Sequence, residues 1–240
     1  MYQHTARTAA DQRVTGLYVT HLDSLVSRLV LPGIFGYDWI PGTDSLVISS
    51  GGVFYEISVR SGEGRQLAIQ PEAFNPSVSP DGRFVAFDRG ADGRSALFLL
   101  DRRDGSAANV TPDSMLYADA DWSPNGEELV TVAGSPHVSG LFRISKTGAP
   151  IQQLIADARF IREPAWSPNG DRIAWLNARG ALRVWLVDTT GANSRPLVAA
   201  TSGASWVSDG SGIALCAPTR TGTRVFIYDL STGRSRQVTF

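Results

Sequence analysis

The chain has 240 residues, a formal net charge of −1 and one cysteine. A charge so close to zero gives no electrostatic reason to expect a nucleic acid or an anionic membrane as a partner, and a lone cysteine excludes an internal disulfide. No apolar run reaches the roughly 18 residues that a membrane-spanning helix needs, so we expect no membrane insertion. The 24 glycines and 13 prolines favour a fold built from many short strands and turns.

The first 31 residues differ from the rest of the chain. Thr15–Leu22 has the composition of a strand, Asp23 can form a turn, and Ser27–Leu31 can form a further strand. These segments match the later part of a unit that recurs downstream, whereas the earlier part of that unit would have to precede Met1. The sequence therefore predicts that the chain begins inside a repeat, with an incomplete first unit whose exposed edge could support self-association.

The recurring unit is clearest between Pro164 and Leu197. A short extended segment leads into the tight turn Pro168-Asn169-Gly170, in which proline presets φ and the next two residues tolerate positive φ. Two apolar, aromatic and β-branched strands follow, and after a second turn at Asp188 a more polar strand ends the unit. The four expected strands are Pro164–Ser167, Arg172–Leu176, Leu182–Val187 and Ser194–Val198.

The first turn of the unit recurs at a nearly constant interval. Its proline position falls at residues 41, 80, 124, 168 and 208, so the steps between successive turns are 39, 44, 44 and 40 residues. At the last of these positions, Ser208 replaces the proline. A large apolar residue lies two positions ahead of each: Trp39, Val78, Trp122, Trp166 and Trp206. A period near 40 residues with four strands per unit is typical of a β-propeller.

We therefore predict an all-β fold, a six-bladed β-propeller of four-stranded antiparallel blades whose first blade is incomplete. Trp122 and Trp166 share the register of Val78, so we expect them to be core residues between blades rather than ligand contacts. The whole chain, 1–240, is expected to form a single propeller domain, with blades at approximately 1–31 (partial), 34–70, 73–111, 116–155, 160–198 and 201–240.

The repeats also carry a family resemblance. The segments PSVSPDGRFVAF, ADWSPNGEELVT and PAWSPNGDRIAW are each followed by an apolar and aromatic strand and a glycine-bearing turn. They resemble the TolB-type β-propeller repeats found in the bacterial Tol–Pal component TolB, in propellers of prolyl-oligopeptidase-type peptidases and in sensor regions of bacterial kinases and regulators. The resemblance covers residues 14–240 and implies a bacterial protein in the periplasm or another extracytoplasmic location.

No catalytic constellation is visible in the sequence. The Gly-x-Ser-x-Gly nucleophile motif is absent, and the three histidines, His4, His21 and His137, show no ligand spacing. We therefore expect no enzymatic activity, no cofactor and no metal. The nearest candidate for a metal site is Asp119-Ala120-Asp121, whose two carboxylates would lie on one face of a strand; calcium there stays an alternative to polar capping of the strand.

The candidate binding residues follow from propeller geometry. The connection into the first strand of each blade runs to the mouth of the central channel, and aromatic side chains with a few polar groups around a concavity are typical of a peptide- or ligand-binding surface. These aromatics could instead only seal the contacts between blades. The candidates are Phe35, Tyr37, Phe74, Asn75, Tyr117, Asp119, Asp121, Phe160, Arg162 and Glu163.

Three functions are compatible with this pattern. We favour a non-catalytic scaffold that binds a protein or peptide partner at the channel mouth. The alternative is an accessory or sensory propeller of a larger enzyme or receptor, such as a prolyl-oligopeptidase-type peptidase or a bacterial kinase or regulator. An enzyme in its own right, for example a metal-assisted lyase or hydrolase, is opposed by the missing histidine cluster.

Overall fold

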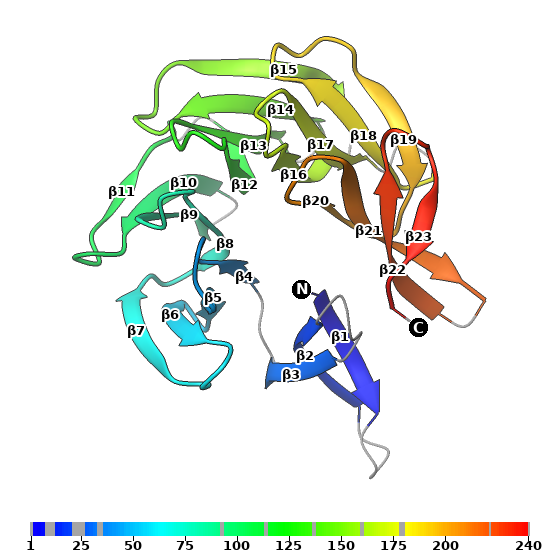
Figure 1. The fold of residues 1–240 in the computed structure, drawn as a ribbon. Helices are drawn as coiled ribbons and strands as arrows, with labels where there is room; N and C mark the ends of the chain where they lie inside the picture. Colours follow the sequence, from blue (N-terminus) through cyan, green and yellow to red (C-terminus); the bar gives the residue numbers. More distant parts are fainter. Residues whose placement is uncertain are drawn as a thin grey trace.

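The computed structural model describes residues 2–7, 13–20, 27–32, 36–91, 94–112, 115–135, 138–158, 161–177, 181–220 and 222–239. Within these ranges, five four-stranded antiparallel sheets are arranged around a central axis as the blades of a propeller (Figure 1). A three-stranded sheet, β1–β3, occupies the sector between the first and the last blade. No helix in the described ranges is long and apolar enough to cross a membrane.

The strands follow one another around the ring in chain order. The three-stranded sheet consists of β1 (Tyr2–Arg7), β2 (Arg13–Thr20) and β3 (Ser27–Pro32). The first two blades are β4 (Gly36–Trp39), β5 (Ser45–Ser50), β6 (Val53–Ser58), β7 (Gly64–Ile69), and β8 (Ala73–Val78), β9 (Phe84–Ala91), β10 (Arg94–Asp101), β11 (Ala107–Asn109). The third blade is β12 (Leu116–Trp122), β13 (Glu128–Ser135), β14 (Val138–Ser145), β15 (Ile151–Ala158). The last two are β16 (Ile161–Trp166), β17 (Arg172–Asn177), β18 (Arg183–Asp188), β19 (Arg195–Ala199), and β20 (Ser202–Trp206), β21 (Gly212–Thr219), β22 (Gly222–Asp229), β23 (Ser235–Gln237).

The prediction of six blades is wrong, because the described residues form five four-stranded blades and a separate sheet of three strands. Each of the five blades begins with a strand that ends at the recurring turn, such as β4 at Trp39, and none of the described strands β1–β3 ends at such a turn. The strand pattern in the first 32 residues was therefore a poor guide to blade number, because β1, β2 and β3 pair with one another as a three-stranded sheet. Self-association through this region stays a prediction.

The recurring turn is closed by its serine. In the second blade the N–H of Gly82 donates to the carbonyl of Ser79 at 2.8 Å, and the Ser79 hydroxyl accepts the N–H of Phe84, also at 2.8 Å. Ser123 and Ser167 bind the equivalent groups of their own turns, and all three serines are buried. The serine thus supplies a partner for backbone groups that enter the core, which explains its place in the motif.

Hydrophobic layers between neighbouring blades form the core. Trp122 packs with Ala86 and Leu97 of the preceding blade, and Trp166 is buried in the equivalent layer one blade further on. The two indoles are 5% and 7% exposed, which confirms that both are core residues. The Trp122 indole N–H also donates to the carbonyl of Ser77 at 3.0 Å, so this side chain links two blades by packing and by a hydrogen bond.

Candidate functional site

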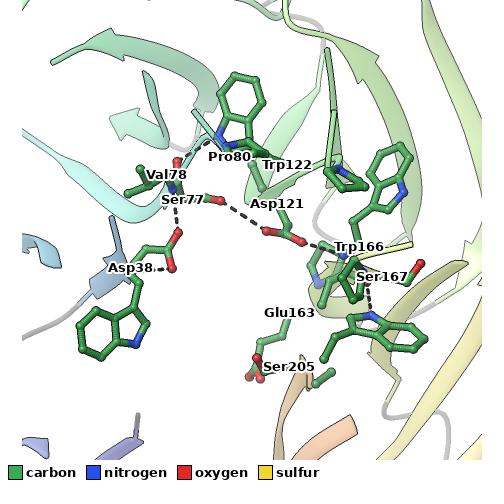
Figure 2. Close-up of a pocket in the computed structure, with 18 of the residues that line it drawn as sticks. Asp38, Ser77, Val78, Pro80, Asp121, Trp122, Glu163, Trp166, Ser167 and Ser205 are labelled. Atoms are coloured by element: carbon green, nitrogen blue, oxygen red, sulfur yellow. Dashed lines mark hydrogen bonds between the residues drawn. The ribbon is translucent and has the colours of Figure 1, made fainter. Parts of the chain in front are cut away.

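A central channel lies where the first strands of the five blades converge (Figure 2). Its larger part is a cavity of about 760 Å³, to which every blade contributes residues. A smaller cavity of about 260 Å³ shares lining residues with the larger one, among them Tyr37, Pro76 and Glu163, so the two cavities are neighbours. We call the smaller cavity the mouth; it is lined by Gly36, Tyr37, Asn75, Pro76, Asp119, Ala120, Glu163 and Pro164.

A β-bulge brings the polar residues of the mouth into place. The pairing of the first strand with the second shifts register in β8, β12, β16 and β20, whereas β4 pairs without a shift. Inside each bulge one residue has positive φ: Asn75 (49°), Asp119 (51°), Glu163 (51°) and Gly203 (77°). Because a bulge turns a side chain away from the regular alternation, these positions face the channel axis rather than the layers between blades.

Channel carboxylates connect three of the blades to the blade that follows. The N–H of Val78 donates to Asp38 at 2.7 Å, the N–H of Trp166 to Asp121 at 2.6 Å, and the N–H of Gly203 to Glu163 at 2.7 Å. In every case the donor belongs to the first strand of the following blade. The carboxylates therefore replace, between blades, the backbone hydrogen bonds that hold strands together within one blade.

Burial alters the acidity of these groups. It raises the pKa of Asp38 to about 7, with a smaller contribution from the charge of Asp121, while the N–H of Val78 opposes the rise. Burial likewise raises the pKa of Asp121 to about 6 and the pKa of Glu163 above its usual value. The Tyr37 pKa rises to about 12, first through burial and then through the charge of Asp38. Perturbed carboxyl pKa values of this kind are typical of functional sites, although structural networks also produce them.

A second polar cluster lies at the mouth. The side-chain amide of Asn75 donates to Asp119 at 3.0 Å and to Asp88 at 3.4 Å. The N–H of Glu163 donates to the other oxygen of Asp119 at 3.2 Å. Asp88 is 8% exposed, and its Oδ1 has no hydrogen-bond partner. Burial and then the charge of Asp119 raise the pKa of Asp88 to about 7.

The candidates from the sequence fall into four groups. Tyr37, Asn75, Asp119 and Glu163 line the mouth, and Asp121 lines the larger cavity. Phe74 and Arg162 are exposed but line neither cavity. Tyr117 is fully buried in a layer between blades, with its hydroxyl unpaired and its pKa raised by burial. Phe35 and Phe160 lie outside the described residues.

Asp38 was missed, although a sequence signal for it exists. Asp38-Trp39 and Asp121-Trp122 occupy the same register of two repeats, and the equivalent positions in other blades hold Ser77 and Ser205. All four residues line the larger cavity. Calcium between Asp119 and Asp121 gains no support, because the described residues contain no group of three or more potential ligands placed to hold a metal ion. The two carboxylates instead have different partners, Asn75 and Ser77.

Comparison with known proteins identifies the family. The family described as the TolB beta propeller domain matches residues 15–205. The chain belongs to this family. No curated protein matches it in sequence.

Solved structures of similar fold include two TolB proteins. TolB from Acinetobacter baumannii has a TM-score of 0.82 and 15% identity over 98% of this chain, which spans 62% of that protein's length. A putative TolB from Agrobacterium tumefaciens has a TM-score of 0.77 and 18% identity, covering 91% of this chain and 86% of its own. An oligogalacturonate lyase in complex with manganese has a TM-score of 0.69 and 14% identity, covering 95% and 70%. At such low identity these likenesses establish the fold only.

Proposed function

We propose that this TolB-like propeller is a non-catalytic scaffold that binds a segment of a protein or peptide partner at the mouth of its channel. The observation that carries the proposal is the mouth itself, a concave site that combines an aromatic residue, Tyr37, with the polar groups of Asn75, Asp119 and Glu163. Such a mixture of apolar surface and a few fixed polar groups suits recognition of an extended segment. The periplasmic or extracytoplasmic location implied by the TolB resemblance belongs to the same proposal.

Phe74 offers exposed apolar surface next to a mouth residue in the sequence, although it lines neither cavity itself. It precedes Asn75 in β8 and is 49% exposed, although large apolar side chains are usually buried. Aromatic side chains dominate the energy of many interfaces because they bury a large area with little loss of side-chain entropy. A segment that crosses the mouth would cover the Phe74 ring.

A matched pair of substitutions tests the proposal. Linear peptides are selected from a random library on the immobilised chain, and their affinities are then measured for the parent, Phe74→Ser and Ile69→Ser. Ile69 is 63% exposed and lies in β7, the strand of the first blade farthest from β4, so it controls for the loss of apolar surface away from the channel. We expect Phe74→Ser to weaken binding by about tenfold or more and Ile69→Ser to leave it unchanged. Equal affinities for all three proteins would show that the partner binds away from the mouth.

A further inference from the structure

The described lining of the channel carries four carboxyl groups and no cationic side chain. Asp38, Asp121 and Glu163 line the larger cavity, and Asp119 lines the mouth. None of the residues that line the two cavities is a lysine, arginine or histidine. Figure 2 shows Asp38, Asp121 and Glu163, which come from three different blades, around the same open space. Arg162, which precedes Glu163 in β16, is exposed and lies outside both cavities, although its charge acts on Glu163.

The channel carboxylates still have capacity to accept hydrogen bonds. A carboxylate offers about four lone-pair positions. Asp38 accepts one N–H on each oxygen, from Trp39 and from Val78. Glu163 accepts the N–H of Gly203 on Oε2 only, among the contacts of the described residues. Donors brought in from outside could therefore bind without displacing the contacts between blades.

An independent observation behind the mouth also indicates a missing donor. Asp88 is more than nine-tenths buried, and its Oδ1 has no partner. Its other oxygen faces the amide of Asn75, which lines the mouth and also binds Asp119. A buried carboxyl oxygen without a hydrogen bond is costly, and a cation at the mouth would reduce that cost.

We propose that the channel accepts the guanidinium group of an arginine side chain from the partner segment, held between the carboxylates of Asp38, Asp121 and Glu163. This inference rests on the function proposed above and specifies the chemistry of the partner. A planar head group with five N–H donors can bind more than one carboxylate at once. A single metal ion would need its oxygen ligands within about 2.6 Å, and the described residues offer no such group.

The walls of the larger cavity suit the same head group. Trp39, which is 37% exposed, and the half-buried Trp206 both line it, together with prolines of the recurring turns. A guanidinium stacks on indole faces, and because it is more weakly hydrated than an ammonium group, it loses less hydration free energy on leaving water. The channel therefore combines negative charge with aromatic surface, which favours arginine over lysine.

Two peptides that differ by one charge test the inference. The first is an acetylated and amidated pentapeptide with a central arginine between alanines, and the second has citrulline in place of arginine, which keeps the shape and removes the charge. Binding to the full chain is measured by titration calorimetry at low and moderate salt. We expect the citrulline peptide to bind at least about tenfold more weakly, because hydrogen bonds to charged groups are the stronger ones.

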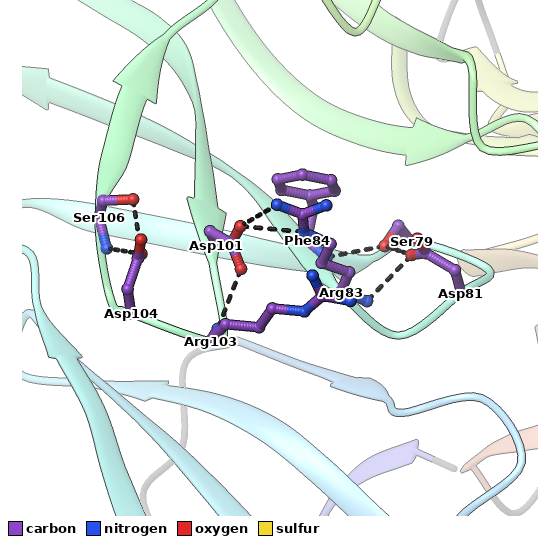
Figure 3. Close-up of polar contacts among 8 residues, drawn as sticks. All are labelled: Ser79, Asp81, Arg83, Phe84, Asp101, Arg103, Asp104 and Ser106. Carbon is purple, nitrogen blue, oxygen red and sulfur yellow. Dashed lines mark hydrogen bonds and ion pairs between the residues drawn. The ribbon is translucent and has the colours of Figure 1, made fainter.

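Variants of the chain locate the binding site. Asp121→Asn and Glu163→Gln should each weaken binding of the arginine peptide by about tenfold. Asp104→Asn is the control, since Asp104 is exposed in the turn after β10, where it accepts hydrogen bonds from Ser106 (Figure 3). If Asp104→Asn weakens binding as much as Asp121→Asn does, the attraction is unspecific and the inference is overturned.

The outcomes also separate this inference from the proposed function. Equal binding of the arginine and citrulline peptides overturns the inference, even if Asp121→Asn fails to fold. Library-selected peptides that depend on Phe74 but carry no arginine overturn it too, and they leave the proposed function intact. Selected peptides whose affinity does not change in Phe74→Ser count against the proposed function itself.

Discussion

Asp38 shows how one side chain serves both the fold and the channel. Its carboxylate accepts the N–H of Val78 from the next blade, and the same group lines the larger cavity. The cost of this position is a charge held among protein atoms and near Asp121, which together raise its pKa to about 7. Contact between blades and negative potential in the channel thus depend on the same atoms.

The raised pKa of Asp38 predicts how stability depends on pH. Its unfolded pKa is near 3.8, so between about pH 4 and pH 7 the folded chain binds more protons than the unfolded chain. The free energy of unfolding should therefore fall as pH rises through this range, by about 1.4 kcal/mol for each unit of displacement. Asp88 acts in the same direction up to about pH 7, and Asp121 up to about pH 6. Asp38→Asn should therefore make the profile less steep, as measured by urea denaturation from pH 4.5 to pH 8.

Asp229 provides the control of opposite sign. It is a turn carboxylate whose pKa is lowered to about 2, first by the hydroxyl of Ser231 and then by the N–H of Thr232. Its contribution to the free energy of unfolding is present above about pH 4 and is lost as pH falls toward 2. Asp229→Asn should therefore leave the slope between pH 4.5 and pH 8 unchanged. A parent profile that is flat or rises through that range would show that Asp38 titrates normally.

At the scale of the element, the outer turns hold the blades at a fixed separation. Gly191, in the turn between β18 and β19, has φ of 91°, and a Cβ added there would lie 2.7 Å from the carbonyl oxygen of Leu154 in β15 of the preceding blade. A Cβ added at Gly148 would likewise lie 2.8 Å from the carbonyl oxygen of Val110. The glycines therefore allow neighbouring blades to approach closely, in addition to forming the turns.

Replacing Gly191 with alanine tests this contact. Gly62 also has positive φ, 77°, but has nothing within 4 Å of an added Cβ. Gly62→Ala should cost about 1–2 kcal/mol of unfolding free energy for the left-handed backbone alone. Gly191→Ala should cost roughly 1–3 kcal/mol more, because the methyl group must push the blades apart. Equal losses in chemical denaturation would mean that the blades shift without cost.

The first strands show which features of an element the sequence could predict. The serine-containing turn and the buried Trp122 followed from spacing and composition, because the core requires the same volume in each repeat. The bulges did not follow, since Glu163 at φ of 51° carries no recognisable sequence signal for a left-handed residue. Tyr117 was predicted at the mouth because it lies in a segment that enters a first strand, whereas the structure buries it completely.

At the scale of the whole molecule, the propeller was predictable and its blade number was not. The repeat of about 40 residues requires stacked four-stranded units, each of which buries its faces on its neighbours. The strands β1–β3 resemble part of a unit, but they form a sheet of three strands. Leu17 of β2 packs against the first blade, where it contacts Leu46 and Ile48. Strand patterns are local, whereas blade number depends on how the strands pair.

The channel forms where the first strands of the five blades converge, and its carboxylates and bulges belong to different blades. A crystal structure of the chain with a library-selected peptide tests this account most directly. We predict that the peptide lies across Phe74 and Asn75, with a cationic side chain directed into the cavity toward Asp121. A peptide bound on the outer strands of the blades, with no part of it in the mouth, would contradict the account.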